Sequence, residues 1–194
     1  MFTQNRTYVL YLVFVSLFIL VFYYISDYFY LKVLTAFHSS LLLEHLFLIP
    51  NHSQVVGNKV FINDFEIIRE CTGIQAIVVF VGLVLFVPRG PWKKKNLSLA
   101  LIIGFVYASN VFRIAFEIWL IESGLLSYAL THYPLSLVLG VIGIFILVIV
   151  TEQIYPQFSE FIIDLVKAMY THINNIWISN LKAKKSRDME VGND

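Results

Sequence analysis

Cysteine and charge are both scarce in this sequence, and each scarcity excludes a class of protein. The chain of 194 residues has one cysteine, Cys71, so it can form neither an intramolecular disulfide nor a cluster of thiolate metal ligands. Only 14% of the residues are charged and the net charge is +1, which provides no field to attract nucleic acid. The thiol therefore acts through its own reactivity, or it is a small apolar side chain.

Hydrophobic residues make up 58% of the chain and come in long uncharged runs, which is typical of a membrane protein. The first run is too long for a signal-peptide core and no small-residue cleavage site follows it, so we expect it to be retained. Each run is close to the roughly 20 residues that cross a bilayer. The predicted segments are Tyr8–Ser26, Tyr30–Ile49, Thr72–Val87, Leu97–Ile121 and Pro134–Ile154.

The second of these segments is the least apolar, because Lys32, Glu44 and two histidines interrupt it. It is expected to lie partly in the membrane interface or to line a polar cavity, which leaves open how often the chain crosses before residue 50. After it, short apolar runs flank Gly57-Asn58, a pair suited to a two-residue hairpin turn. We expect a small β-hairpin in residues 51–70 that leads directly to Cys71.

Basic residues gather in the loop at 88–96, whereas residues 122–133 contain no Lys or Arg. The positive-inside bias therefore places the first loop in the cytoplasm. The hairpin, Cys71 and His132 are then expected on the extracytoplasmic side of the cell membrane.

Residues after Pro156 repeat apolar side chains at helical spacing, which predicts an amphipathic helix on the inner surface at 157–181. The basic stretch at 182–194 is expected to be a disordered tail. The predicted fold class is an all-α membrane protein. It is a multi-spanning helical bundle with a small extracytoplasmic β-hairpin before the cysteine helix and a C-terminal amphipathic helix, and its transmembrane domain is residues 1–156.

Three residues of complementary chemistry are expected at one depth of the bilayer. Cys71 precedes the third segment, where free backbone N–H groups favour a thiolate. Counting about 1.5 Å per residue from Leu97 places Arg113 about 24 Å up a hydrocarbon layer about 30 Å thick. His132 stands just before the fifth segment. A nucleophile, a fixed cation and a group that titrates near neutral pH are what acyl transfer requires.

Further residues near these three are candidates for binding substrate. Asn110 and Glu117 fall three residues before and four after Arg113, so the three share one helix face. Glu117 either neutralises the arginine as a structural pair or orients it for catalysis. Gly73 has no side chain and would let a substrate backbone approach closely.

The segments Glu70-Cys71-Thr72-Gly73-Ile74 and Asn110-Val111-Phe112-Arg113-Ile114, followed by His132, resemble the signature of the exosortase/archaeosortase family, and the short chain resembles its compact archaeosortase-like members. The resemblance implies a membrane-embedded cysteine transpeptidase or protease. Such an enzyme cleaves the C-terminal sorting signal of exported proteins, which comprises a short motif, a transmembrane helix and a basic tail, and transfers the new C-terminus to an acceptor, here a membrane lipid or a lipid-linked group.

Carried over by motif, Cys71 would be the nucleophile of a thioester mechanism, Arg113 would stabilise the oxyanion or orient the substrate, and His132 would be the general acid and base. His52 in the hairpin region is the alternative histidine. No cofactor and no metal are implied. The acceptor, the substrate motif and the oligomeric state stay open.

Two other classes of function remain compatible with the residues. The chain could be a non-catalytic transport or assembly subunit, in which Arg113 and Glu117 form a buried structural pair. It could also be another membrane enzyme, such as an acyltransferase that uses Cys71 or a metalloprotease that uses His38, Glu44 and His45. These last residues lack the His-Glu-x-x-His spacing that brings two ligands and a base together.

Overall fold

A computed structural model describes residues 2–24 and 28–191 of the chain. Most of the described chain is helical, with a three-stranded antiparallel sheet between the second and third helices. The helices are α1 (Phe2–Tyr24), α2 (Phe29–His45), α3 (Ile74–Leu85), α4 (Trp92–Glu122), α5 (Tyr128–Leu130), α6 (Ser136–Ile154) and α7 (Pro156–Val191). The strands are β1 (Ser53–Val56), β2 (Lys59–Ile62) and β3 (Phe65–Glu66), and the short turns are the 3₁₀ turn η1 (Arg69–Thr72) and the π-helical turn η2 (Thr131–Leu135).

Within the described residues, three helical stretches are long and apolar enough to cross a membrane: Arg6–Tyr24, Trp92–Glu122 and Tyr128–Ile154. These confirm the first, fourth and fifth predicted segments. The fifth begins earlier than expected, because η2 accommodates Pro134 within one continuous helical path. Proline has no N–H to donate, and a π turn is one way for a helix to contain it.

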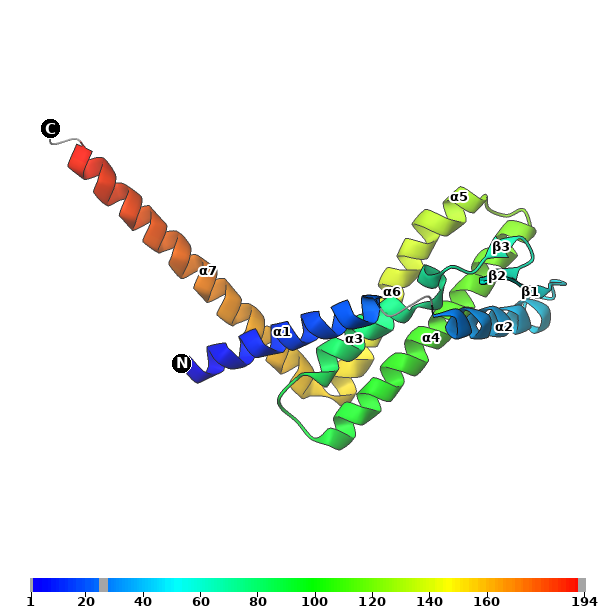
Figure 1. The fold of residues 1–194 in the computed structure, drawn as a ribbon, viewed down its shortest axis with the longest axis horizontal. Helices are drawn as coiled ribbons and strands as arrows, with labels where there is room; N and C mark the ends of the chain where they lie inside the picture. The colour runs from blue at the N-terminus through cyan, green and yellow to red at the C-terminus, as the bar shows by residue number, and fades with distance from the viewer. Residues whose placement is uncertain (1, 25–27, 192–194) are drawn as a thin grey trace.

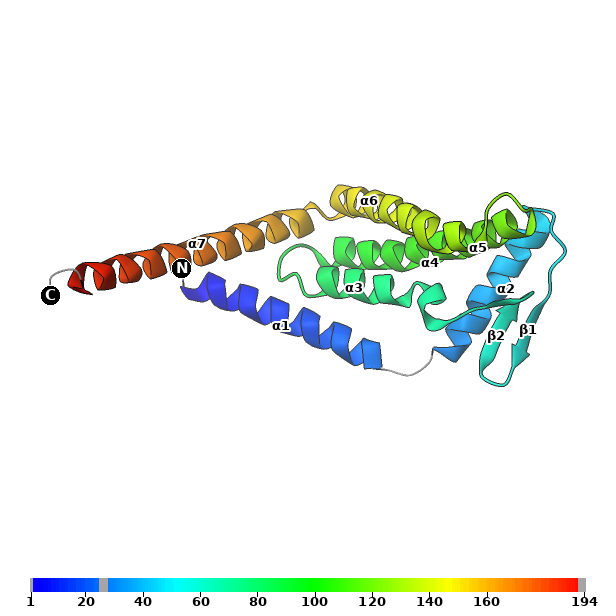
Figure 2. The same cartoon turned by 90° about the horizontal axis from the view of Figure 1, so that it is seen from above.

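Two predicted segments are shorter than expected. α2 ends at His45 and is not among the helices that could span, and one face of it buries the polar side chains of Lys32, Thr35 and Ser39. α2 is steeply inclined to the other helices and lies beside the sheet (Figure 2). α3 has 12 residues, which is about 18 Å of helix and too short to cross a bilayer alone.

The sheet contains the predicted hairpin and one strand more. β1 and β2 pair around Gly57-Asn58, with Val56 opposite Lys59, as the turn sequence predicts. A second turn at Asn63-Asp64 then adds β3 to the outer side of β2. Asn63 has a positive φ of 52°, which asparagine tolerates better than most residues.

Two separate hydrophobic cores hold the molecule together. At the end that contains the N-terminus of α4, side chains from five helices surround Tyr11, Ile102 and Phe161. At the other end, α2 and the sheet pack against α4 around Leu43, Ile62 and Ile118. In Figure 1 the sheet and α2 lie at the end of the bundle opposite the chain termini.

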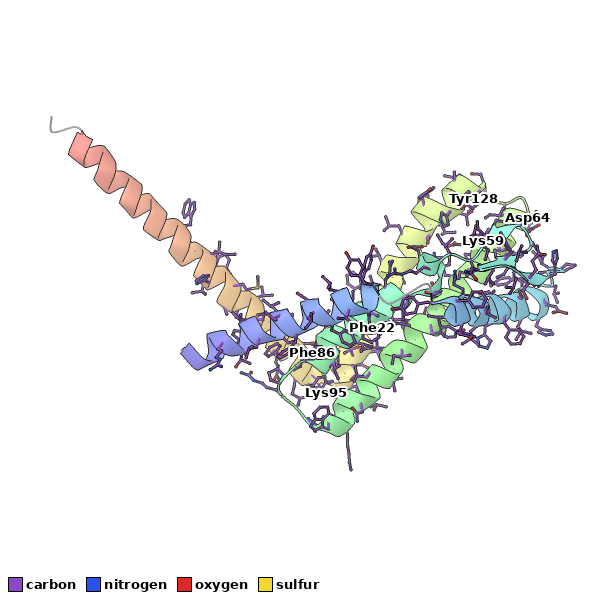
Figure 3. All side chains as sticks on the ribbon, in the orientation of Figure 1. Phe22, Lys59, Asp64, Phe86, Lys95 and Tyr128 are labelled. Carbon is purple, nitrogen blue, oxygen red and sulfur yellow. The ribbon has the colours of Figure 1, made fainter. Side chains whose placement is uncertain are left out.

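A buried lysine stabilises the loop that joins α3 to α4. The Lys95 ammonium donates to the carbonyl oxygens of Leu85 at 3.2 Å and Val87 at 2.7 Å. Figure 3 shows Lys95 at one end of the bundle, and Asp64 and Tyr128 at the other. The basic loop and the sheet are thus at opposite ends, as the topology prediction requires.

α7 is longer than the predicted amphipathic helix. Its first turns bury Phe158, Phe161 and Leu165 against α1, and it then extends away from the bundle (Figure 1). Residues 182–191, expected to be disordered, continue the helix. This stretch contains no Gly or Pro, and seven of its ten residues are Lys, Arg, Ala, Met or Glu, which favour helix.

Candidate active site

Cys71 lies in η1, before α3 begins. Its backbone N–H donates to the Ile68 carbonyl at 3.0 Å, which closes the turn. Thr72, fully buried, donates its hydroxyl to the Arg69 carbonyl at 2.7 Å and accepts from the Ile74 N–H at 3.4 Å. These hydrogen bonds hold the cysteine in a tight turn.

Gly73 joins this turn to α3. Because it has no side chain, Asn110 of α4 can pack directly against its backbone. Its φ of +70° favours glycine, and a Cβ there would lie 3.2 Å from the Cβ and Cγ of Asn110. The space expected to admit substrate is thus occupied by α4, and Gly73 does not line the cavity described below. Its contribution is to let η1 approach α4 closely.

Asn110 connects the cysteine turn to the arginine. Its side-chain N–H donates to the Cys71 carbonyl at 2.5 Å, and its Oδ1 accepts from Arg113 Nη2 at 3.0 Å. Arg113 Nη1 donates to Glu117 Oε1 at 3.1 Å and to the Ser136 hydroxyl. The predicted helix face of Asn110, Arg113 and Glu117 is therefore a continuous hydrogen-bonded row.

One cavity of about 410 Å³ brings the three predicted catalytic residues together. Cys71 from η1, Arg113 from α4 and His132 from η2 all line it. The remaining wall comes from α4, from the segment 64–68 and from Tyr128. Among the described residues, the Cys71 thiol makes no hydrogen bond to His132, so any proton transfer between them would occur once a substrate is bound.

A column of rings positions His132 at this cavity. The imidazole stacks on Tyr128, with 5.2 Å between ring centroids and 15° between planes. Tyr128 in turn stacks on Phe65 of β3 at 6.5 Å. The third strand, which the sequence did not predict, therefore braces the histidine.

Burial raises the pKa of the Cys71 thiol, against the lowering effects of the Ile68 backbone contact and the Arg113 guanidinium. Glu117 and Glu70 raise the pKa further. This raised pKa disfavours the thiolate, which is the opposite of the effect expected from a helix N-terminus. A base must take its proton as it attacks.

This raised pKa predicts slow alkylation of Cys71 at neutral pH. The rate with a small haloacetamide should keep rising above pH 9.0, the ordinary pKa of the thiol. Arg113→Gln should move the midpoint to higher pH, because it removes a cation that favours the thiolate, and Glu70→Gln should move it lower. A midpoint near neutral pH in the wild-type chain would contradict this assignment.

The other candidates from the sequence lie elsewhere. His52 does not line the cavity and is exposed, and its backbone N–H donates to Asn63 Oδ1 at 3.1 Å. His38 contacts the Tyr107 hydroxyl at 2.7 Å within the bundle. Within residues 2–24 and 28–191, no group of three His, Cys, Asp or Glu could hold a metal ion.

Two contributors to the site were missed from the sequence. Ser136 accepts from Arg113, and Tyr128 supports His132. Ser136 carried a weak signal, since it is a polar residue that directly precedes the uncharged apolar run 137–150. Tyr128 carried none, because its role depends on the position of β3.

The architecture and the cavity together define a class: a multi-spanning membrane protein with cysteine, arginine and histidine around one cavity at one end of its helices. The family model described as transmembrane exosortase matches residues 2–124, which include Cys71 and Arg113 but not His132. The chain belongs to the transmembrane exosortase family. No curated protein and no solved structure matches it.

Family membership implies a membrane sorting transpeptidase that acts on proteins with sorting signals. The family is one of cysteine transpeptidases. The match ends two residues after α4, so it covers α1 to α4 together with the sheet.

Proposed function

We propose that this chain cleaves the C-terminal sorting signal of exported proteins through a Cys71 thioester and transfers the new C-terminus to an acceptor. The observation that carries the proposal is the convergence of Cys71, Arg113 and His132 on one cavity from three separate elements. Family membership supports the same chemistry.

In the first half-reaction, the Cys71 sulfur attacks the carbonyl carbon of the scissile peptide bond while His132 accepts the thiol proton. A tetrahedral intermediate forms, and its oxyanion is held by the Arg113 guanidinium. The carbon–nitrogen bond then breaks, and His132 returns the proton to the leaving amine. The product is a thioester between Cys71 and the new C-terminus of the substrate.

In the second half-reaction, a hydroxyl or amine of the acceptor attacks the thioester, and His132 accepts its proton. The carbon–sulfur bond breaks, and the sulfur recovers its proton from His132. A membrane lipid or a lipid-linked group is the acceptor we favour, since the cavity belongs to a membrane protein. Water as the acceptor would give simple proteolysis by the same steps.

Asn110 and Glu117 act as positioning residues in this proposal. Both side chains are largely buried, and both hydrogen-bond to Arg113. With Ser136, they give the Arg113 guanidinium three hydrogen-bond partners. These partners restrict its orientation, which pre-organises it for the developing oxyanion. Glu117 also lines the cavity and is available to substrate, whereas Asn110 acts through Cys71 and Arg113.

We place the cavity on the extracytoplasmic side of the cell membrane, because Lys93, Lys94 and Lys95 lie at the opposite end. In a Cys71→Ala background, Ser123→Cys should react with a membrane-impermeant maleimide in intact cells. Lys94→Cys should react only after the cells are opened, and both positions are exposed. The reverse labelling pattern would overturn the orientation.

His132→Ala is expected to lower processing of a tailed substrate by about 10²- to 10⁴-fold, the usual range for removing a general acid–base group. Cells that carry an exported protein with a C-terminal sorting tail report this by gel shift and by mass spectrometry of the new terminus. His52→Ala is the matched control and should process normally. If His52→Ala lost activity instead, the acid–base role would pass to His52.

A further inference from the structure

A second cavity, of about 360 Å³, borders the cysteine turn through Arg69 and shares no lining residue with the first. It is formed by the ends of α1 and α3 that approach η1, and its walls include Ile19, Phe22, Val78 and Val79. Arg69, two residues before Cys71, provides its charged group. The cavity is thus an apolar groove with a guanidinium at one end.

Two tyrosine rings hold Arg69 in place, and within residues 2–24 and 28–191 no carboxylate neutralises it. Its guanidinium carbon lies 4.6 Å from the ring centroid of Tyr23 and 5.6 Å from that of Tyr28. Its Nε is buried and has no hydrogen-bond partner, and no ion pair joins it to a carboxylate of the described chain. Because Arg69 is only partly buried and lines the groove, the terminal N–H groups of its guanidinium can meet an acceptor from outside the protein, and an anion is the favoured partner.

Tyrosines gather near Arg69 at one end of α1. The apolar span of α1 ends at Tyr24, Tyr23 precedes it, and Tyr28 and Tyr30 come after it. Tyrosines favour the boundary between hydrocarbon and lipid headgroups. Tyr28 donates its hydroxyl to the Phe22 carbonyl at 2.5 Å, which fixes its ring beside Arg69.

We propose that this groove binds one membrane phospholipid, with the phosphate on Arg69 and an acyl chain along the apolar walls of α1 and α3. A phosphodiester presents two oxygens to the planar guanidinium, which recognises that geometry. Val79 is exposed at the groove, so an acyl chain can enter from the surrounding bilayer. A peptide with a basic tail fits less well, because Arg69 would repel its charge.

The test uses the purified full chain in phosphatidylcholine vesicles that contain phosphatidylglycerol with a photoreactive acyl chain. Labelled peptides, mapped by mass spectrometry, should concentrate at residues 19–23 and 74–79 rather than at the exposed face of α6 around Phe145. Arg69→Gln should lower groove labelling about tenfold, the loss expected for a charge-assisted contact. Val79→Trp should lower it as well, by filling the groove and leaving the charge intact.

Arg89→Gln is the matched control, since Arg89 lies in the α3–α4 loop at the opposite end and should leave labelling unchanged. A photoreactive diacylglycerol of the same chain length, which lacks phosphate, should label wild type and Arg69→Gln equally and weakly.

The proposal fails if labelling is even over the lipid-facing helices or insensitive to Arg69→Gln. It also fails if a synthetic sorting-tail peptide displaces the lipid from the groove, which would identify a peptide site. None of these outcomes depends on Cys71 chemistry, and Cys71→Ala should label like wild type.

Discussion

Cys71→Ala is expected to abolish processing of a tailed substrate, with a loss of at least roughly a thousandfold, because no other described group in the cavity replaces a nucleophilic sulfur. Processing is measured by gel shift and by mass spectrometry of the new C-terminus. Cys71→Ser should be nearly as inactive, because a serine hydroxyl ionises far less readily than the thiol.

Folding defects must be separated from this loss of chemistry. Cys71 is only partly buried, and Cys71→Ala retains the backbone contacts that hold η1, so insertion and protein level should match wild type. Ser123→Ala, in the exposed loop after α4, serves as the neutral control. Normal processing by Cys71→Ala at a normal protein level would refute the transpeptidase and favour a non-catalytic membrane subunit.

Arg113→Gln is expected to lower processing by about 10²- to 10³-fold, the range for removing one oxyanion donor. The same change leaves Glu117 buried without its 3.1 Å partner, which costs about 3–5 kcal/mol of stability when a buried pair is broken. Exposure of this pair is small, at 19% and 10% of the side chains, so that cost is only partly screened. A drop in activity alone would therefore not distinguish catalysis from structure.

The double variant Arg113→Gln/Glu117→Gln separates the two roles. Two neutral amides can hydrogen-bond to each other, so the stability lost in the single variant should largely return. If Arg113 acts on the substrate, processing stays low in this stable double variant. If Arg113 and Glu117 are a structural pair, processing returns with stability. The exposed pair Lys59–Glu66, 3.0 Å apart on the sheet, is the matched control and should tolerate Lys59→Gln/Glu66→Gln.

The local features of the fold could be predicted because they depend on short-range physics. Gly57-Asn58 directs a two-residue turn whatever the rest of the chain does, and it forms the hairpin of β1 and β2. Long uncharged runs predicted the spanning helices for the same reason. The row of Asn110, Arg113 and Glu117 follows from helical spacing alone.

The features that were missed depend on contacts between distant elements. The polar residues of α2 predicted that it departs from a simple span, but not that its polar face packs against α4, where Ser39 donates to the Val111 carbonyl. β3 has two residues and is defined by its pairing with β2. Ser136 reaches Arg113 only because α6 packs beside α4. Gly73 was expected to face substrate, but the approach of Asn110 fills that space.

The central claim, that Cys71 carries the substrate as a thioester, is tested most directly by mass spectrometry of the Cys71 peptide from reactions quenched with acid. The wild-type chain, mixed with a tailed substrate and deprived of acceptor, should yield a Cys71 peptide that carries the substrate's N-terminal part through a bond that hydroxylamine cleaves. Product that accumulates while Cys71 stays unmodified and fully available for alkylation would contradict the mechanism.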